Sequence, residues 1–214
     1  MFDAVLRRRL DRPLAAAARL VDRPGVTPDR LTVAGLLVGL TSAGLAAGQQ
    51  WGWALAAWLL SRALDGLDGP LARRRASGHG SPAGGFLDIT ADFVAYGTTV
   101  VGVAVGTVGT SASLTDWLPF LAVLLAYYVN GTAFLAFSSI AERTGHRIDD
   151  GRSLSFLGGI AEGAETILVH SVWLLVPAYA PAVATGWAVV VGTSAAHRVA
   201  TGYRTLRGPA AAAS

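Results

Sequence analysis

The sequence contains no cysteine and no lysine, and it carries few charged residues for a chain of 214. The absence of cysteine excludes disulfides, catalytic thiolates and cysteine-ligated zinc, and the absence of lysine excludes Schiff-base chemistry. Charged residues make up 14% of the chain, whereas soluble domains carry about 25%. Apolar residues make up 52%, and the mean hydropathy is +0.48. This balance is typical of a polytopic membrane protein, with room at this length for about six spans.

Apolar segments alternate with short polar connections along most of the chain. They cover residues 31–48, 51–72, 85–108, 114–139, 158–177 and 182–203. They predict an all-α polytopic fold with six transmembrane helices. We expect a single domain over residues 1–214, made of an amphipathic juxtamembrane helix within 1–26, a six-helix bundle over 27–207 and a tail at 208–214. Residues 1–26 mix arginines with apolar residues, as helices on an anionic membrane surface do.

The arginines predict how the chain is oriented in the membrane. They gather in the N-terminal segment, in the connections 73–83 and 140–153 and in the C-terminal tail, while the connections near 49–50, 109–116 and 178–181 contain none. The positive-inside rule therefore predicts that both termini and both basic connections are cytoplasmic, in what we expect to be a bacterial inner membrane. We interpret the net charge of +3 as topology, not as a signal for nucleic acid.

Four aspartates lie on two neighbouring apolar segments: Asp65, Asp68, Asp88 and Asp92. A carboxylate at membrane depth costs roughly 2.5–3.5 kcal/mol on insertion scales. Spacings of i,i+3 and i,i+4 place each pair on one helix face, so two facing helices would form an all-oxygen pocket. Hard cations such as Mg²⁺ and Mn²⁺ prefer oxygen ligands. The pattern therefore favours a divalent metal site at the cytoplasmic end of the second and third segments.

The same region resembles the signature of the CDP-alcohol phosphatidyltransferases, Asp-x2-Asp-Gly-x2-Ala-Arg followed after a short gap by Gly-x3-Asp-x3-Asp. The matching positions are Asp65, Asp68, Gly69, Ala72, Arg73, Gly84, Asp88 and Asp92. The motif covers residues 65–92, and the six-segment pattern extends the resemblance over most of the chain. Ten residues separate Arg73 from Gly84, more than is usual in the family. Their polar composition predicts a longer surface loop.

The resemblance implies an enzyme that transfers a phosphatidyl group from a CDP-linked lipid, such as CDP-diacylglycerol, to a polar alcohol and releases CMP. By similarity, the four aspartates would hold two Mg²⁺ or Mn²⁺ ions, with Asp92 also acting as the general base. The remaining motif residues would line the CDP-lipid site: Gly69, Ala72, Arg73 and Gly84. The family resemblance also implies a homodimer.

Four other arginines are candidates for binding the acceptor alcohol, because a guanidinium presents two parallel donors to a phosphate. They are Arg143, Arg147, Arg152 and Arg198. They favour a phosphorylated acceptor, such as glycerol 3-phosphate or inositol phosphate, although an unphosphorylated alcohol stays open. The competing interpretation of these arginines is ordinary cytoplasmic loop charge.

Two other classes of protein compete with the enzyme. One is a divalent-cation transporter with an intramembrane aspartate site. Against it, the acidic residues gather toward one membrane face, and Asp116 is the exception on the other side. The other is a structural membrane protein with a degenerate site, which the complete set of four aspartates disfavours.

Overall fold

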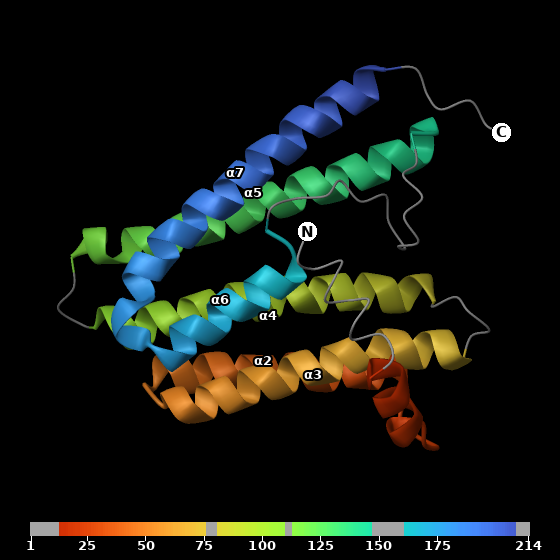
Figure 1. Ribbon diagram of the computed structural model, residues 1–214, viewed down its shortest axis with the longest axis horizontal. Helices are drawn as coiled ribbons and strands as arrows, with labels where there is room; N and C mark the ends of the chain where they lie inside the picture. Colours follow the sequence, from red (N-terminus) through yellow and green to blue (C-terminus); the bar gives the residue numbers. More distant parts are fainter. Residues whose placement is uncertain (1–12, 76–80, 110–112, 147–160, 209–214) are drawn as a thin grey trace.

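A computed structural model describes residues 13–75, 81–109, 113–146 and 161–208. Within these ranges the regular structure is helical: residues 13–21, α2 (Pro28–Ala47), α3 (Trp51–Arg75), α4 (Pro82–Val108), α5 (Leu114–Thr144), α6 (Gly163–Leu175), the short 3₁₀ helix η1 (Pro177–Tyr179) and α7 (Ala180–Arg207) (Figure 1). Each of the six predicted apolar segments overlaps one of the helices α2 to α7, so the all-α prediction is confirmed.

Local signals fix where the helices near the aspartates begin. Thr27 caps α2 by accepting a hydrogen bond from the backbone N–H of Arg30 at 3.2 Å. Ser81 caps α4 in the same way, since its hydroxyl accepts from the N–H of Gly84 at 2.9 Å. A proline follows each cap, where its missing N–H costs no helical hydrogen bond. These two caps place the start of α2 and of α4 beside the end of α3.

Fewer helices are long and apolar enough to cross a membrane than the six that the sequence pattern predicted. Among the described helices, α2, α4 and α5 are each long and apolar enough to cross a membrane. α6 and the following η1–α7 segment pass the same test only together, with a bend of 111° between them, which gives up to four spans. From Arg62 to its end α3 carries four arginines and two aspartates, which lowers its apolarity. Six spans therefore stay a prediction.

The helices form two packed groups. α2 packs closely on both α3 and α4, and α5 packs along α7, while α6 lies between the groups in Figure 1. The α2–α4 contact depends on two glycines of α4. A Cβ added at Gly102 would lie 2.3 Å from the carbonyl oxygen of Ala43, and one at Gly106 would lie 2.1 Å from that of Ala46. Only glycine permits backbones this close, as in other membrane helix pairs.

Aromatic side chains and a histidine fill the space between the groups. His170 of α6 is fully buried, stacks on Trp58 of α3 with ring centroids 4.9 Å apart, and shares a 2.9 Å hydrogen bond with the hydroxyl of Tyr127 of α5. Trp187 of α7 donates its indole N–H to the same hydroxyl at 2.7 Å. The Tyr127 hydroxyl thus joins His170 and Trp187, whereas His170 Nδ1 and Trp173 Nε1 in the same cluster are buried without a hydrogen-bond partner among the described residues.

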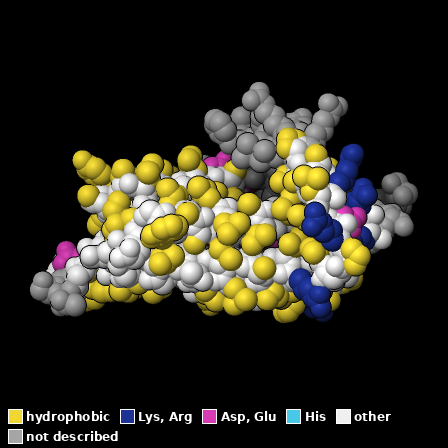
Figure 2. Space-filling view, turned by 90° about the horizontal axis from the view of Figure 1, so that it is seen from below, with side chains coloured by type: hydrophobic (Ala, Val, Ile, Leu, Met, Phe, Trp, Pro, Cys, Tyr) yellow, Lys and Arg dark blue, Asp and Glu magenta, His cyan; other side chains and the backbone are white. Residues whose placement is uncertain are grey.

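Arginines gather at one end of the bundle. The last turns of α3 and α7 carry Arg73, Arg74, Arg75, Arg204 and Arg207, and α5 ends with Arg143 in its last turn. Figure 1 shows these three helix ends on the same side of the molecule, with the short connections α2–α3 and α6–α7 on the other. On the face seen in Figure 2, arginine side chains cluster at that end and apolar side chains cover most of the rest. The positive-inside rule rests on such an excess of arginine at one end of a helical bundle.

Candidate metal centre

Three of the four motif aspartates converge across the gap between α3 and α4. Asp65 and Asp68 lie on α3 and Asp88 lies on α4. One carboxylate oxygen from each lies within 4.8 Å of the other two. Asp68 is buried, while Asp65 and Asp88 are partly exposed. An all-carboxylate group of this size provides the hard oxygen ligands that Mg²⁺ and Mn²⁺ prefer.

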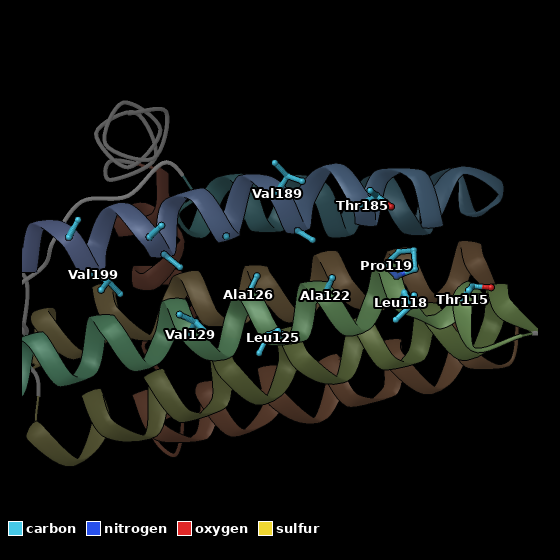
Figure 3. A pocket seen from close by; sticks show the side chains of 15 residues that line it. Thr115, Leu118, Pro119, Ala122, Leu125, Ala126, Val129, Thr185, Val189 and Val199 are labelled. Atoms are coloured by element: carbon cyan, nitrogen blue, oxygen red, sulfur yellow. The ribbon is translucent and has the colours of Figure 1, made fainter.

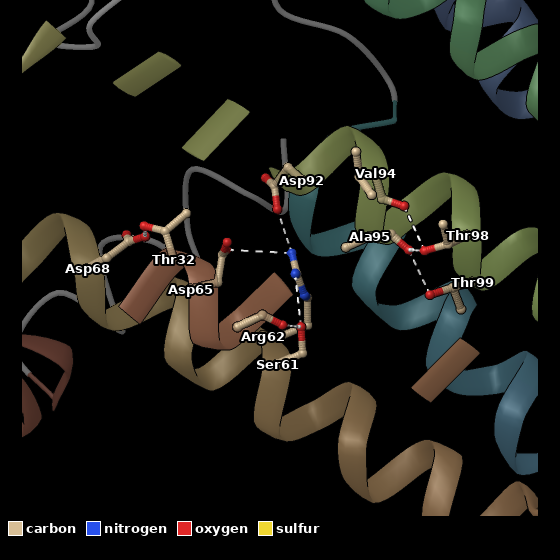
Figure 4. A network of polar contacts seen from close by, with 11 residues as sticks. Thr32, Ser61, Arg62, Asp65, Asp68, Asp92, Val94, Ala95, Thr98 and Thr99 are labelled. Atoms are coloured by element: carbon tan, nitrogen blue, oxygen red, sulfur yellow. Dashed lines mark hydrogen bonds and ion pairs between the residues drawn. The ribbon is translucent and has the colours of Figure 1, made fainter. Parts of the chain in front are cut away.

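Asp68 is held from the neighbouring helix α2. The hydroxyl of Thr32 donates to Asp68 Oδ2 at 2.5 Å (Figure 4). α2 enters the bundle beside the end of α3, so the fifth residue of α2 lies opposite the aspartate. A hydrogen bond to a ligand carboxylate fixes its orientation, which is the usual role of residues that surround a metal site.

Asp92 is engaged differently from the other three. Arg62 Nη1 lies 2.5 Å from Asp92 Oδ1 and 3.6 Å from Asp65 Oδ2, so the guanidinium stands between these two carboxylates (Figure 4). The Arg62 side chain is only 5% exposed, whereas that of Asp92 is 31% exposed. Asp65 lies three residues further along the same helix, but the shorter contact is with Asp92 on α4, so Arg62 connects the two helices.

The remaining motif residues lie at the open ends of α3 and α4. The exposed Arg73 side chain folds back along α3, so that a Cβ added at Gly69 would lie 3.3 Å from its Nη1. A Cβ added at Gly84 would lie 3.2 Å from Asp29 Oδ1, which brings the start of α2 to the same rim. Ala72 is half-buried. Among these four motif residues, Arg73 is the one with a long side chain.

The segment before α2 is anchored to the end of α3. Asp22 accepts from Arg74 Nε at 2.7 Å and from Arg75 Nη2 at 2.6 Å, and Arg75 also donates to the carbonyl of Val26. The hydrogen bonds from Arg74 and Arg75 hold the pKa of the Asp22 carboxyl below its ordinary value. Leu14, in the helix 13–21, packs over Gly66, between the first two motif aspartates. The rest of the predicted amphipathic segment, residues 1–12, lies outside the described residues.

The family model of the CDP-alcohol phosphatidyltransferases matches residues 25–195, which is most of the chain. The chain belongs to the CDP-alcohol phosphatidyltransferase family. The resemblance inferred from the eight motif positions is thereby confirmed, and the protein is a transferase.

Relatives of this family member are found in bacteria and archaea. Inner membrane protein YnjF of Escherichia coli (strain K12) is 38% identical over 214 residues, which cover 97% of this chain and 98% of that protein. Archaetidylinositol phosphate synthase of Methanothermobacter thermautotrophicus is 34% identical over 170 residues, 78% of this chain and 72% of that one. Together with the apolar helices, the first match supports an integral membrane protein.

The fold is also shared with a solved structure. Mycobacterium tuberculosis phosphatidylinositol phosphate synthase (PgsA1) with CDP-DAG bound gives a TM-score of 0.73 at 22% identity, over 90% of this chain and 94% of that one. The same synthase in complex with manganese and citrate gives 0.71 at 21% identity, over 89% and 88%. At this level of identity the likeness establishes the common fold.

The candidate acceptor arginines are not brought into one described cluster. Arg198 of α7 is buried, and its Nη1 donates to Asn130 Oδ1 of α5 at 3.2 Å, with its guanidinium 5.8 Å from the ring of Phe134. Arg143 is exposed near the end of α5. Arg147 and Arg152 lie outside the described residues. The hydrogen bond between Asn130 and Arg198 therefore joins α5 to α7.

A separate groove of about 930 Å³ runs between α5 and α7 (Figure 3). Its walls are apolar or small side chains such as Leu118, Ala126, Val189 and Val199, with Thr115 at one end. None of the four motif aspartates lines it. A polar alcohol or a divalent ion needs convergent polar groups, so the groove does not compete with the aspartate group as the reaction site.

Proposed function

We propose that this family member transfers a phosphatidyl group from CDP-diacylglycerol to the hydroxyl of a polar alcohol and releases CMP. The observation that carries the proposal is the convergence of Asp65, Asp68 and Asp88, with Asp92 one helical turn further along α4. The presence of CDP-DAG in the M. tuberculosis synthase of the same fold supports the choice of donor.

The donor set fits divalent cations. Three carboxylates provide six oxygens within a small volume, and neither sulfur nor nitrogen ligands occur among them. We propose that Asp65, Asp68 and Asp88 hold two Mg²⁺ or Mn²⁺ ions, which the manganese complex of the M. tuberculosis synthase supports. Bound divalent ions would neutralise charge on the diphosphate of the donor. Asp92 as a further ligand stays a prediction from the family signature.

The proposed step is a substitution at phosphorus. The acceptor oxygen forms a bond to the lipid-side phosphorus of the donor, and the bond from that phosphorus to the CMP oxygen breaks. The Asp92 carboxylate takes the hydroxyl proton as the general base. This step requires the acceptor hydroxyl to bind within hydrogen-bond reach of Asp92. CMP leaves with the electron pair of the broken bond. Arg73, at the rim, would contact a phosphate oxygen of the donor through its guanidinium.

The acceptor that we propose is phosphorylated. Arg198 offers a buried guanidinium beside the Asn130 amide and the Phe134 ring. In the sequence, Arg143, Arg147 and Arg152 add positive charge at and after the last turn of α5. The relatives named as inositol phosphate synthases favour inositol phosphate over glycerol 3-phosphate.

The same reasoning extends to the arrangement in the membrane. We propose six spans, with both termini and the aspartate group on the cytoplasmic side of a bacterial inner membrane, because the arginine-rich helix ends lie together. The family resemblance adds a homodimer to this proposal.

The experiment is an assay of CMP release by the purified protein with CDP-diacylglycerol and Mg²⁺ or Mn²⁺. The acceptors to compare are inositol phosphate, glycerol 3-phosphate, inositol, serine and water. Asp92→Asn is the inactive variant, and Asp116→Asn, at the opposite end of the bundle, is its matched control. Release that depends on one alcohol and is lost in Asp92→Asn supports the proposal. Metal flux into proteoliposomes without CMP release from any pair of substrates would favour the transporter instead.

A further inference from the structure

The groove between α5 and α7 has a buried floor and exposed rims (Figure 3). Ala126 of α5 and Ala195 of α7 lie on its floor and are buried. Leu125 and Val189 lie on its rims and are 63% and 65% exposed. A Cβ added at Gly192, another lining residue, would meet no atom within 4 Å, so the space above the floor is open. The groove can therefore be entered from the outer face of the bundle.

The lining of the groove is suited to an apolar occupant. Among the described residues that line it, the hydroxyl groups are those of Thr115 and Thr185, and both are engaged. Thr185 donates to the carbonyl oxygen of Pro181 at 3.0 Å, and Thr115 shares a hydrogen bond with the hydroxyl of Ser113. A polar ligand would lose its hydration here without gaining hydrogen bonds. The occupant must therefore be apolar where it lies between the helices.

The groove is long enough for an acyl chain. Its lining residues on α7 run from Thr185 to Ala200, which is about 22 Å at a rise of 1.5 Å per residue. One leaflet of a bilayer is roughly 15 Å deep, half of its hydrocarbon core. A chain that enters from one leaflet can therefore lie in the groove over its full length.

Arginines lie on the same side of the two helices, beyond one end of the groove. Arg143 follows Leu125 on α5, and Arg207 follows Val189 on α7, each after about five full turns. Both arginines are exposed. Glu142 is the acidic residue among the described residues of these two helix ends, and it lies about 100° round α5 from Arg143. The apolar groove thus leads toward a positively charged end.

The two helices stay together up to these arginines. Leu206 of α7 packs against Phe137 and Ala141 of α5. The exposed Tyr203 lies one turn before Arg207, and the guanidinium carbon of Arg207 is 5.7 Å from the centroid of the Tyr203 ring. Tyrosine and arginine are typical of the boundary between membrane and water, where lipid phosphates lie. The surface therefore changes from apolar to cationic in the direction in which a lipid changes from tail to head.

We propose that the α5–α7 groove and the arginines beyond it bind one anionic glycerophospholipid, with an acyl chain along the groove and the phosphate at Arg143 and Arg207. The apolar tail and the negative head of such a lipid match the two parts of this surface in their order. The site is separate from the aspartate group, because its residues belong to α5 and α7 whereas the motif aspartates belong to α3 and α4.

The test is native mass spectrometry of the lipid-stripped protein in detergent, with EDTA and without CDP-lipid, so that the donor site is not loaded. The probes are dioleoyl phosphatidylglycerol, which is anionic, and dioleoyl phosphatidylcholine, which has no net charge. We expect one phosphatidylglycerol per chain, bound about tenfold more tightly than phosphatidylcholine, because an arginine near a lipid phosphate contributes about fivefold. Equal affinities for the two lipids overturn the proposal.

Two matched pairs of variants locate the site. Gly192→Leu fills the groove and should weaken the binding of both lipids about tenfold, the loss of about two buried methylenes. Gly186→Leu, on the same helix with open space around its Cβ but outside the lining, should not weaken it. Arg143→Gln/Arg207→Gln should bring the two affinities within about twofold, whereas Arg204→Gln should keep the preference. Equal losses within either pair refute a defined site.

Chain length provides a check that needs no variant. Dihexanoyl phosphatidylglycerol keeps the head group but has short chains, and each buried methylene contributes about fourfold in affinity. It should therefore bind wild type at least about tenfold more weakly than the dioleoyl lipid. Equal binding of the two would show that the head group alone is held, which overturns the role of the groove.

The same spectra report the number of chains in each particle. If Gly192→Leu converts dimers to monomers and leaves lipid binding unchanged, the groove is an interface between copies of this chain and the lipid proposal is wrong. None of these measurements uses CMP release, so a failure of the proposed function would leave them readable.

Discussion

The Thr32 hydroxyl lies 2.5 Å from Asp68 Oδ2 and 3.2 Å from the carbonyl oxygen of Pro28. A hydroxyl has one proton to donate, and the shorter distance assigns it to the aspartate. The contact links the first turns of α2 to the most buried of the three converging carboxylates. It also explains why a polar residue lies at a buried position of an otherwise apolar helix.

Replacing Thr32 by valine should weaken metal binding. The change keeps the shape of the side chain but removes the hydroxyl, and residues that support a metal ligand typically contribute about 10–100-fold in affinity. We expect Mn²⁺ affinity of Thr32→Val to fall within that range, and Thr32→Ser, which keeps the hydroxyl, to stay close to wild type. Equal affinities for the valine and serine variants would show that the hydrogen bond does not orient Asp68.

The anchor at Asp22 predicts a pH effect confined to the N-terminal segment. Arg74 and Arg75 lower the pKa of Asp22 in the folded protein. The ion pairs of Asp22 therefore stabilise the packing of the N-terminal segment on α3 fully above the ordinary carboxyl pKa of about 4. This stabilisation is lost as the pH falls through the lowered pKa. The protection factors for hydrogen exchange at residues 13–25, each referred to the intrinsic rate at that pH, should therefore fall in wild type as the pH drops from about 5 to 3.

The control for this effect is Asp22→Asn, which has no carboxylate to titrate. It should show low protection factors in the same residues already at pH 7, with little further change of these factors in acid. Slow exchange in Asp22→Asn at neutral pH would mean that apolar contacts such as that of Leu14 with Gly66 hold the segment without the ion pairs.

Gly102 sets the distance between α2 and α4. An alanine there would place its Cβ 2.3 Å from the backbone oxygen of Ala43, and backbone cannot move aside as a side chain does. Overpacking of this kind costs about 1–3 kcal/mol or more. Gly102→Ala should lower the melting temperature in detergent, while Gly97→Ala, on the same helix with open space around its Cβ, should not. Similar melting temperatures for the two variants would contradict the close approach.

The positions of the helices and of the aspartates could be predicted because both follow from local patterns. Long apolar runs separated by Pro, Gly and Arg residues define α2 to α7 within a few residues at most ends. Pro70 and Pro119 lie inside α3 and α5, as they lie inside the predicted segments 51–72 and 114–139. The i,i+3 and i,i+4 spacings correctly placed Asp65, Asp68 and Asp88 on facing surfaces.

The partners of these aspartates could not be predicted, because they depend on the register between helices. Nothing local in the sequence shows that Thr32 lies opposite Asp68, or that Arg62 reaches across to Asp92 more closely than to Asp65. Sequence proximity favoured the pair with Asp65, which is on the same helix. The guanidinium of Arg62 also packs on the ring of Tyr96 from another helix, and this contact cannot be predicted from the residues around Arg62 in the sequence.

Metal binding should stabilise the fold, since an ion that binds only the folded protein adds to its stability. Mn²⁺ at a hundredfold excess over its dissociation constant would contribute about 2.7 kcal/mol. We expect the melting temperature of wild type to rise with Mn²⁺ and to return with EDTA, and we expect a smaller rise in Asp88→Asn at the same Mn²⁺ concentration. CMP release should stop with EDTA and resume with Mg²⁺ or Mn²⁺. Turnover that persists in EDTA would rule out the metal centre as part of the reaction.

Arg198 tests whether the acceptor carries a phosphate. A hydrogen bond between charged groups contributes about 1.5–3 kcal/mol, so its loss in Arg198→Ala should raise KM for a phosphorylated acceptor by roughly 10–100-fold. The KM for CDP-diacylglycerol should change little. Arg204→Ala, an exposed arginine on the same helix, is the matched control and should leave both values close to wild type. An equal rise of both KM values in Arg198→Ala would instead assign the residue to holding α7 against α5 through Asn130.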